Sequence, residues 1–173
     1  MKEPSPVNYF AYMDSPIGRL CLSGNESGLT RILFEHEETK ASADSAWIED
    51  TNNFQEPIQQ LTEYFCGERQ TFEIPLSPNG TPFQKSVWGK LQLIPYGETT
   101  TYGEIADALD NPNGSRAVGT ANGQNPIPIL IPCHRVIGSD GSLTGYAGGI
   151  EIKDFLLKLE RKHAQSGQGV FAF

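Results

Sequence analysis

The chain has 173 residues, of which 38% are hydrophobic and 20% are charged, a composition typical of a folded globular protein rather than a disordered or fibrous one. No stretch approaches the roughly 20 apolar residues that a membrane-spanning helix needs. The first residues carry acid and proline where a signal peptide would carry an apolar run. We therefore expect no membrane partner and no secretion signal.

The net charge of −8 argues, taken alone, against a nucleic-acid-binding protein, because phosphate contacts need Lys and Arg. The charge is unevenly distributed, however. Residues 1–80 contain five basic and thirteen acidic residues, whereas residues 81–173 contain eight of each. A neutral second half can still present a local basic face to DNA, while the acidic first half should be held away from it.

The three cysteines are an odd number at scattered spacings, which fits neither a disulfide framework nor a closed zinc site. Free thiols of this kind indicate a reducing compartment, so we expect a cytoplasmic protein.

The first half reads as a hairpin, a loop and a helix. Residues 15–24 and 28–35 are partly alternating runs joined by the turn-rich GNESG. Residues 35–53 are acidic and weakly periodic, which predicts a surface loop or a short helix. A helix is expected from Pro57 to a glycine stop at Gly67. The proline-rich stretch that follows reads as a linker, and we place the boundary between two domains, 1–80 and 81–173, there.

The second half opens with a capping box, Thr81 with Gln84, and a proline at the first helical position. We expect this helix to end at residues 95–97. Its apolar stripe is formed by Phe83, Val87, Trp88, Leu91 and Ile94.

A second capping box, Thr101 with Glu104, opens a short helix, and after a turn Ser115 is expected to cap a third helix over 116–122. Two short helices joined by a tight turn are a helix-turn-helix candidate, although most such pairs only build a core. The third helix is rich in small residues, so it can approach a groove closely but has few side chains able to read bases.

Cys133 is followed directly by His134 and Arg135. The thiolate is the nucleophilic form of cysteine, and a neighbouring base or positive charge promotes its formation. The alternative is that Cys133 is only a small buried residue; Cys21 and Cys66, which have no base nearby, are interpreted in that structural way. The last helix is expected to bury Ile152, Phe155, Leu156 and Leu159, with Glu160 at the border of that stripe.

The sequence around this cysteine, NPIPIL followed by IPCHRVIG, GYAGG and KDFLLKLE, resembles the O6-alkylguanine-DNA alkyltransferases. The resemblance covers residues 81–163 and continues more weakly through SPIGRLCLSGNESGL and LTEYFCGER. It implies an α+β fold, with an N-terminal α/β domain that has a small antiparallel sheet and is ribonuclease H-like. The C-terminal domain would be mostly helical and of winged-helix type, with a helix-turn-helix.

The resemblance also implies the reaction: DNA repair by stoichiometric transfer of an alkyl group from O6 of guanine, and from O4 of thymine, in double-stranded DNA to Cys133. His134 matches the base that takes the thiol proton, in the family through a water, and Glu160 matches the carboxylate that orients this histidine. Tyr102 matches the proton donor to the leaving guanine, and Asn125 the residue that braces the cysteine turn. No cofactor is implied, and we expect a monomer.

The target base must leave the stack, and the resemblance implies flipping through minor-groove binding. Arg116 matches the residue that fills the vacated space. The other DNA contacts implied are Ala117, Ala121, Thr101, Arg135 and again Tyr102. The implied walls of the base pocket are Val136, Tyr146, Ala147 and Gly148. Some relatives hold zinc with Cys and His, but Cys21, His36 and Cys66 lack that spacing, so we expect no metal.

Two other classes of function stay open on the sequence. A non-enzymatic helix-turn-helix regulator would need side chains that read base edges, in which residues 116–122 are poor. A cysteine hydrolase or acyltransferase would need turnover and an oxyanion hole.

Overall fold

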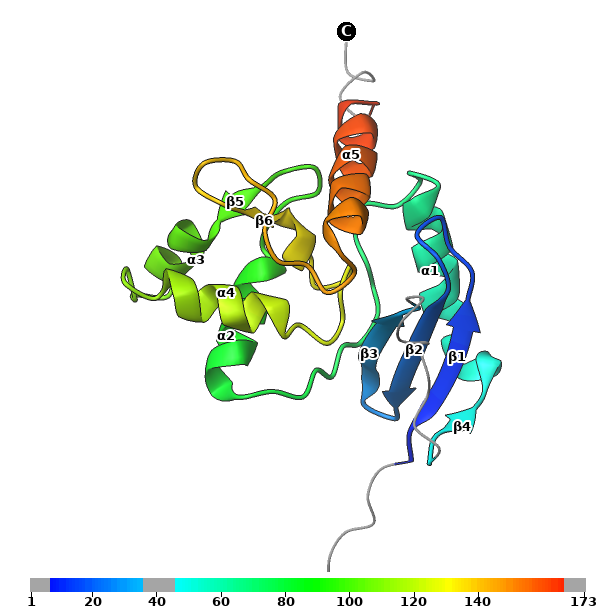
Figure 1. Cartoon of the computed structure of the whole chain (residues 1–173). Helices are drawn as coiled ribbons and strands as arrows, with labels where there is room; N and C mark the ends of the chain where they lie inside the picture. Colours follow the sequence, from blue (N-terminus) through cyan, green and yellow to red (C-terminus); the bar gives the residue numbers. More distant parts are fainter. Residues whose placement is uncertain (1–6, 36–45, 167–173) are drawn as a thin grey trace, which may run out of the picture. The chain divides into compact units, whose positions relative to one another are not determined.

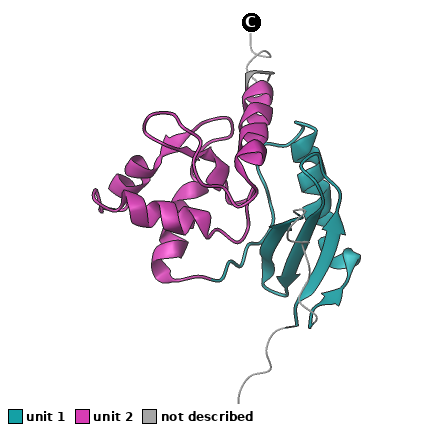
Figure 2. Cartoon of the chain, in the orientation of Figure 1, with its two compact units in different colours: residues 1–79 teal, residues 80–173 magenta. Residues whose placement is uncertain are grey.

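The computed structural model describes residues 7–35 and 46–166. It divides into two compact units, Met1–Asn79 and Gly80–Phe173, coloured separately in Figure 2. The fold is mixed α+β, as predicted: the first unit carries the sheet and the second is mostly helical. Within the described residues, no helix is long and apolar enough to cross a bilayer.

The sheet of the first unit has four strands in the order β3-β2-β1-β4 (Figure 1). The strands β1 (Tyr9–Met13), β2 (Leu20–Asn25) and β3 (Gly28–Phe34) are antiparallel neighbours, whereas β4 (Ile48–Glu49) runs parallel to β1. The predicted hairpin is confirmed as β2 and β3. The sequence reading missed β1, whose partner β2 supplies the pairing that makes it a strand.

Among the described residues of this unit, one α-helix accompanies the sheet: α1 (Gln55–Phe65), which follows the 3₁₀ helix η1 (Thr51–Phe54). It begins two residues before the expected Pro57 and ends as predicted. Gly67 has a φ of 77°, and its amide and that of Glu68 bond back to the last turn, which is the geometry that favours glycine after a helix. Part of the predicted loop, 36–45, lies outside the described residues; the rest of it holds β4 and most of η1.

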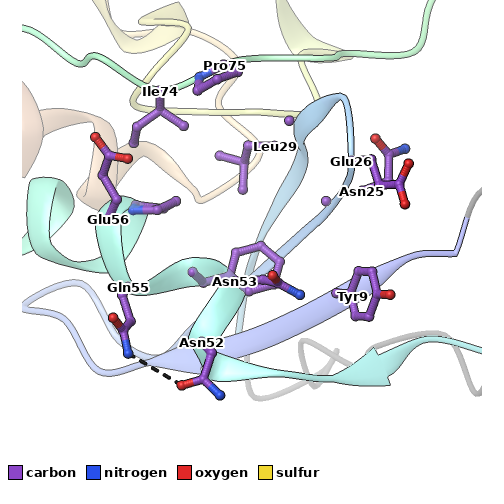
Figure 3. A pocket seen from close by; sticks show the side chains of 14 residues that line it. Tyr9, Asn25, Glu26, Leu29, Asn52, Asn53, Gln55, Glu56, Ile74 and Pro75 are labelled. Atoms are coloured by element: carbon purple, nitrogen blue, oxygen red, sulfur yellow. Dashed lines mark hydrogen bonds between the residues drawn. The ribbon is translucent and has the colours of Figure 1, made fainter.

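The first unit also contains a pocket of about 550 Å³, seen in Figure 3. Buried Leu29 and Phe54 contribute its apolar lining, and Glu26 and Glu56 are its charged residues. None of the predicted site residues lines it. The chemistry predicted from the sequence therefore has to be sought in the second unit.

The second unit is built from helices and one two-stranded parallel sheet (Figure 1). Its elements are α2 (Pro82–Leu91), β5 (Thr100–Thr101), α3 (Tyr102–Ala108), α4 (Ser115–Gly123), η2 (Cys133–Arg135), β6 (Val136–Ile137) and α5 (Ile150–Ser166). The helices α2, α3 and α4 pack on one another, and α5 packs on η2. The two-residue strands β5 and β6 were not predicted.

Both predicted capping boxes are present at Thr81 and Thr101, with the two reciprocal hydrogen bonds that define the motif. Two helix limits differ from the prediction. Helix α2 ends at Leu91, so Ile94 lies beyond it. Ser115 is the first residue of α4 rather than its cap, because the carbonyl of Gly114 already accepts the first helical bond, from Val118.

The buried face of α5 also differs from the prediction. Phe155 is 36% exposed, while Leu156 and Leu157 are buried together with two charged residues, Lys153 and Glu160. The buried face of α5 is therefore rotated relative to the apolar stripe that the sequence predicts. It includes Lys153 and Glu160 because both charged groups have hydrogen-bond partners in the interior.

Candidate active site

The cysteine lies at the end of a tight, buried turn. Ile129 in this turn has a φ of 76°, a left-handed conformation that β-branched residues rarely adopt. The side chain of Asn125 spans the turn: its Nδ2 donates to the carbonyl of Ile131 at 2.7 Å, and its Oδ1 accepts from the amide of Ile127 at 3.0 Å. These bonds hold the strained segment in place and fix where η2, and thus Cys133, begins.

Within η2, Cys133 is 4% exposed and His134 is fully buried. The Nε2 of His134 lies 2.7 Å from Oε1 of Glu160 on α5, a carboxylate that is also fully buried. The other ring nitrogen, Nδ1, is buried and has no hydrogen-bond partner among the described residues. If Nε2 carries the proton and donates to Glu160, Nδ1 has a lone pair available to accept a proton.

The prediction that Arg135 contacts DNA is wrong. Its side chain is buried, and its guanidinium makes two bonds to Glu160, from Nε to Oε2 at 2.9 Å and from Nη2 to Oε1 at 3.0 Å. A third bond goes to the carbonyl of Ile94. Because the side chain is buried and each of its three nitrogens already donates to a carboxylate or a carbonyl, it is not available to a phosphate at the surface.

The Glu160 carboxylate accepts a fourth hydrogen bond, from the amide of Gly97 at 3.1 Å. Gly97 has a φ of 79°, and a Cβ there would lie 2.6 Å from the Cβ of Ala164, so only glycine fits. Burial alone would raise the pKa of Glu160, but its hydrogen bonds with His134 and Arg135 and the positive charge of Arg135 outweigh it and hold the pKa at about 2. Glu160 is therefore ionised in the interior.

The thiol and the imidazole are both kept neutral by burial. Burial raises the pKa of Cys133 to about 11, against the opposing effects of Asn125 and the charge of Lys153. Burial lowers the pKa of His134, although its bond to Glu160 acts in the other direction. A neutral thiol beside a neutral imidazole needs proton transfer to His134 to become a thiolate, and the arrangement provides that base.

Lys153 was not singled out from the sequence, yet it lies among these groups. It is fully buried, and its Nζ donates to the carbonyls of Val136 and Thr144, at 2.5 and 2.8 Å. It therefore ties the strand after the cysteine to the loop before α5. A lysine on a helix reads as a solvated charge, and no local signal in the sequence indicates two buried carbonyl acceptors.

Tyr102, the first residue of α3, is half-buried and reaches the same loop. Its hydroxyl donates to the carbonyl of Thr144 at 3.2 Å and accepts a hydrogen bond from the Thr144 hydroxyl at 3.2 Å. Both residues, with Thr101 and Arg116, line a pocket of about 670 Å³. The structure thus brings three of the predicted DNA contacts together.

The outward face of α4 supplies the rest of this surface. Arg116 and Ala117 are exposed, and Gly119 and Thr120 line the pocket. Ala121 is 2% exposed, and its carbonyl accepts a bond from the indole of Trp88. This burial speaks against the prediction that Ala121 contacts DNA, although its spacing of four residues puts it on the same side of α4 as the exposed Ala117.

Of the predicted base-pocket residues, Val136 lies in β6 directly after η2, and Tyr146, Ala147 and Gly148 lie just before α5. Val136 is fully buried, and Tyr146 has a half-buried ring with a buried hydroxyl. Ala147 is exposed, whereas Gly148 is buried with Tyr146 and Ile152 close to its Cα hydrogens. Two of the four predicted base-pocket residues, Ala147 and Gly148, are therefore small.

No cluster of three or more His, Cys, Asp or Glu side chains suited to a metal occurs in the described part of the chain. Cys21 is buried and Cys66 is exposed, while His36 lies outside the described residues. The expected absence of a metal stays a prediction.

These observations define a class: a protein with a buried cysteine nucleophile, a histidine base and an orienting carboxylate in a helical unit. Two family models match the chain: the DNA binding domain of 6-O-methylguanine DNA methyltransferase over residues 82–162, and its ribonuclease-like domain over residues 8–78.

The similar proteins point the same way. The methylated-DNA–protein-cysteine methyltransferase of Methanosarcina acetivorans is 54% identical over 88% of this chain and 97% of its own length. That of Bacillus subtilis, described as constitutive, is 47% identical over 90% of this chain and 96% of its own length. The crystal structure of Mycobacterium tuberculosis OGT in complex with DNA has a TM-score of 0.83 at 47% identity, covering 90% of this chain and 94% of that one.

The chain belongs to the 6-O-methylguanine DNA methyltransferase family. It is an enzyme of the methylated-DNA–protein-cysteine methyltransferase class and acts in DNA repair by alkyl transfer.

Proposed function

We propose that this protein repairs double-stranded DNA by moving an alkyl group from O6 of guanine, and from O4 of thymine, to its own Cys133 in one irreversible step. The observation that carries the proposal is the arrangement of His134, whose Nε2 is held by ionised Glu160 while Nδ1 has no partner among the described residues, directly after the buried cysteine. This is the order of nucleophile, base and orienting group that activates a thiol.

In the reaction, His134 takes the thiol proton and the Sγ of Cys133 attacks the alkyl carbon. The S–C bond forms as the C–O6 bond breaks, and the electron pair stays with guanine. Guanine gains one proton and the thiol loses one, so the step balances without a cofactor. Tyr102 donates the proton to the leaving base and regains one from solvent, while His134 releases the thiol proton to solvent. The thioether formed on Cys133 has no route back to a thiol within this chemistry, so each protein acts once.

The alkylated atom lies inside the base stack, so the nucleotide must be flipped out before Cys133 can reach it. The exposed face of α4 supports binding in the minor groove, because Ala117 and Gly119 let the helix approach closely and Arg116 is long enough to occupy the space left by the base. The related Mycobacterium tuberculosis OGT has been crystallised in complex with DNA. We propose that a monomer binds in this way.

The same face argues against a sequence-specific regulator. Arg116 is the one charged side chain on α4, and Ala117, Gly119 and Gly123 have nothing with which to read base edges. A lesion can occur in any sequence, so a surface with little base readout suits repair.

The test is an intact-mass measurement after incubation with excess duplex DNA that contains one O6-methylguanine. We expect a single methyl-sized increase, located on Cys133 by peptide mapping, and one repaired guanine per protein. Continued repair with no mass change would indicate a hydrolase, and DNA binding without methyl transfer would indicate a regulator.

A further inference from the structure

Thr144 stands out because it contacts Tyr102, the proposed proton donor, through both its hydroxyl and its carbonyl. Its hydroxyl donates to the phenol oxygen of Tyr102, and its carbonyl accepts the phenol proton, each at 3.2 Å. These are the hydrogen bonds that the structure shows for the Tyr102 hydroxyl within the described residues. The orientation of the phenol is therefore set by one residue of the 138–145 loop.

The same carbonyl has a second donor. Lys153 Nζ lies 2.8 Å from it, and a carbonyl oxygen has two lone pairs, so both donors are accommodated. When the phenol proton turns away from Thr144 toward a base, the carbonyl keeps its bond to the buried lysine. Releasing Tyr102 therefore leaves no unsatisfied acceptor behind, which removes a penalty that such a release would otherwise carry.

The hydroxyl of Thr144 stabilises the phenol oxygen of Tyr102 during proton transfer. As Tyr102 gives up its proton to the leaving guanine, negative charge grows on the phenol oxygen. A hydrogen bond already donated to that oxygen becomes stronger as the charge develops, so it favours the transition state over the ground state. The threonine hydroxyl is in place to do this before the substrate arrives.

We propose that Thr144 is a positioning residue for the alkyl-transfer reaction: its hydroxyl and carbonyl, with Lys153 behind the carbonyl, hold the Tyr102 phenol and allow it to release its proton to the departing guanine. This inference rests on the proposed function, in which Tyr102 is the donor.

The experiment compares Thr144→Val, which removes the hydroxyl and keeps the shape, with Thr144→Ser, which keeps the hydroxyl. Each substitution is made alone and in combination with Tyr102→Phe. The readouts are the maximal single-turnover rate of Cys133 methylation by a duplex with one O6-methylguanine, and separately the affinity for that duplex.

We expect Thr144→Val to lower the maximal rate about three- to tenfold, the effect of one well-placed hydrogen bond, with unchanged DNA affinity. Thr144→Ser should restore most of the native rate. In the Tyr102→Phe background Thr144→Val should have no further effect, because the group through which it acts is gone.

A second substrate separates proton donation to the leaving group from the attack of the thiolate. Methyl iodide can methylate Cys133 directly, and iodide leaves without needing a proton. Its rate at Cys133, followed by peptide mapping, should be the same in the native protein and in Thr144→Val.

Several results would overturn the inference: a native rate in Thr144→Val, an equal loss in the Tyr102→Phe background, a Thr144→Ser variant as slow as Thr144→Val, a change in DNA affinity alone, or an equal loss with methyl iodide. Failure of the proposed function gives a different result, since the native protein would then carry no methyl group on Cys133 after incubation with the duplex.

Discussion

Two regions of the second unit, the cysteine centre and the exposed face of α4, are built on opposite principles. In the cysteine centre, Cys133, His134, Arg135 and Glu160 are buried, and the carboxylate accepts four hydrogen bonds. The α4 face carries one long charged side chain, Arg116, among small residues. The reactive side chains are thus held in place by buried hydrogen bonds, whereas DNA recognition depends on an exposed helix face of small residues. Substitutions should separate the two.

The largest effect is expected at the nucleophile. Cys133→Ala and Cys133→Ser should abolish alkyl transfer to the protein, because both remove the acceptor thiol, while affinity for duplex DNA should change by less than about threefold. Mass spectrometry and a DNA-binding titration measure the two properties. Cys66→Ser, at an exposed cysteine, is the control and should behave as native. Stoichiometric transfer by either Cys133 variant would move the acceptor to Cys21 or Cys66.

The next largest effect is expected at Glu160, which serves the cysteine centre without touching the substrate. Glu160→Gln replaces one oxygen by an amino group that faces donors from His134 and Arg135. It should slow alkylation about 10²- to 10³-fold, by disturbing the histidine tautomer. Breaking a buried charge pair should also cost about 3–5 kcal/mol of unfolding free energy.

The matched control is Glu151→Gln, at an exposed position on the same helix, which should leave rate and stability unchanged within about 0.5 kcal/mol. Stopped-flow rates and urea unfolding are the measurements. A Glu160→Gln protein with the native rate would remove the carboxylate from the mechanism.

Arg116→Ala tests the exposed face of α4. It should weaken reaction with an alkylated duplex about 10- to 100-fold and leave reaction with free O6-benzylguanine nearly unchanged, since unstacking a base costs a few kcal/mol only in the duplex. Arg161→Ala, at an exposed position on α5, is the control for loss of a positive charge. Equal losses on both substrates would make Arg116 a structural or pocket residue.

The same contrast explains what the sequence could and could not predict. Local signals were reliable: both capping boxes, Gly67 and the β2–β3 hairpin depend on residues a few positions apart, and they form as expected. The cysteine, its histidine and the glutamate were found through a resemblance, and the structure brings them together.

The errors share a physical cause. Arg135 and Lys153 were misread or overlooked because a charged side chain is normally solvated, and their buried acceptors come from residues far away along the chain. Ala121 lies one turn after Ala117 on the same side of α4, so its spacing could not reveal that it is buried while Ala117 is exposed. Strands β5 and β6 consist of two residues each, too few for any period to be visible.

A smaller effect is expected at Ala147 and Gly148, two small residues of the predicted base pocket. Ala147 is exposed and Gly148 has no side chain, so we expect the native protein to accept benzyl groups as well as methyl. Ala147→Trp should slow reaction with an O6-benzylguanine oligonucleotide about tenfold and spare the O6-methyl one, because overpacking a site typically costs about 1–3 kcal/mol. The second-order rates for both oligonucleotides decide this. A native protein that already rejects benzyl more than about a hundredfold would contradict the idea.

The smallest expected effect, the pH dependence, distinguishes two ways of forming the thiolate. Burial raises the pKa of Cys133 to about 11. If hydroxide alone removed the proton, the rate would rise about tenfold per pH unit between 7 and 9. If His134 removes it, the rate follows the neutral imidazole instead.

Burial lowers the pKa of His134 below its ordinary value of 6.5, so its neutral form persists to lower pH than in a free histidine. Lowering the pH from 8 to 6.5 should therefore change the maximal alkylation rate by less than about twofold, the loss that an unshifted histidine would show at pH 6.5. The decline should begin only below that pH. Single-turnover rates between pH 5 and 9 on free O6-benzylguanine avoid any effect of pH on DNA binding. A rate that climbs steadily to pH 9 would show that His134 is not the base, and would leave the buried Glu160 with a purely structural role.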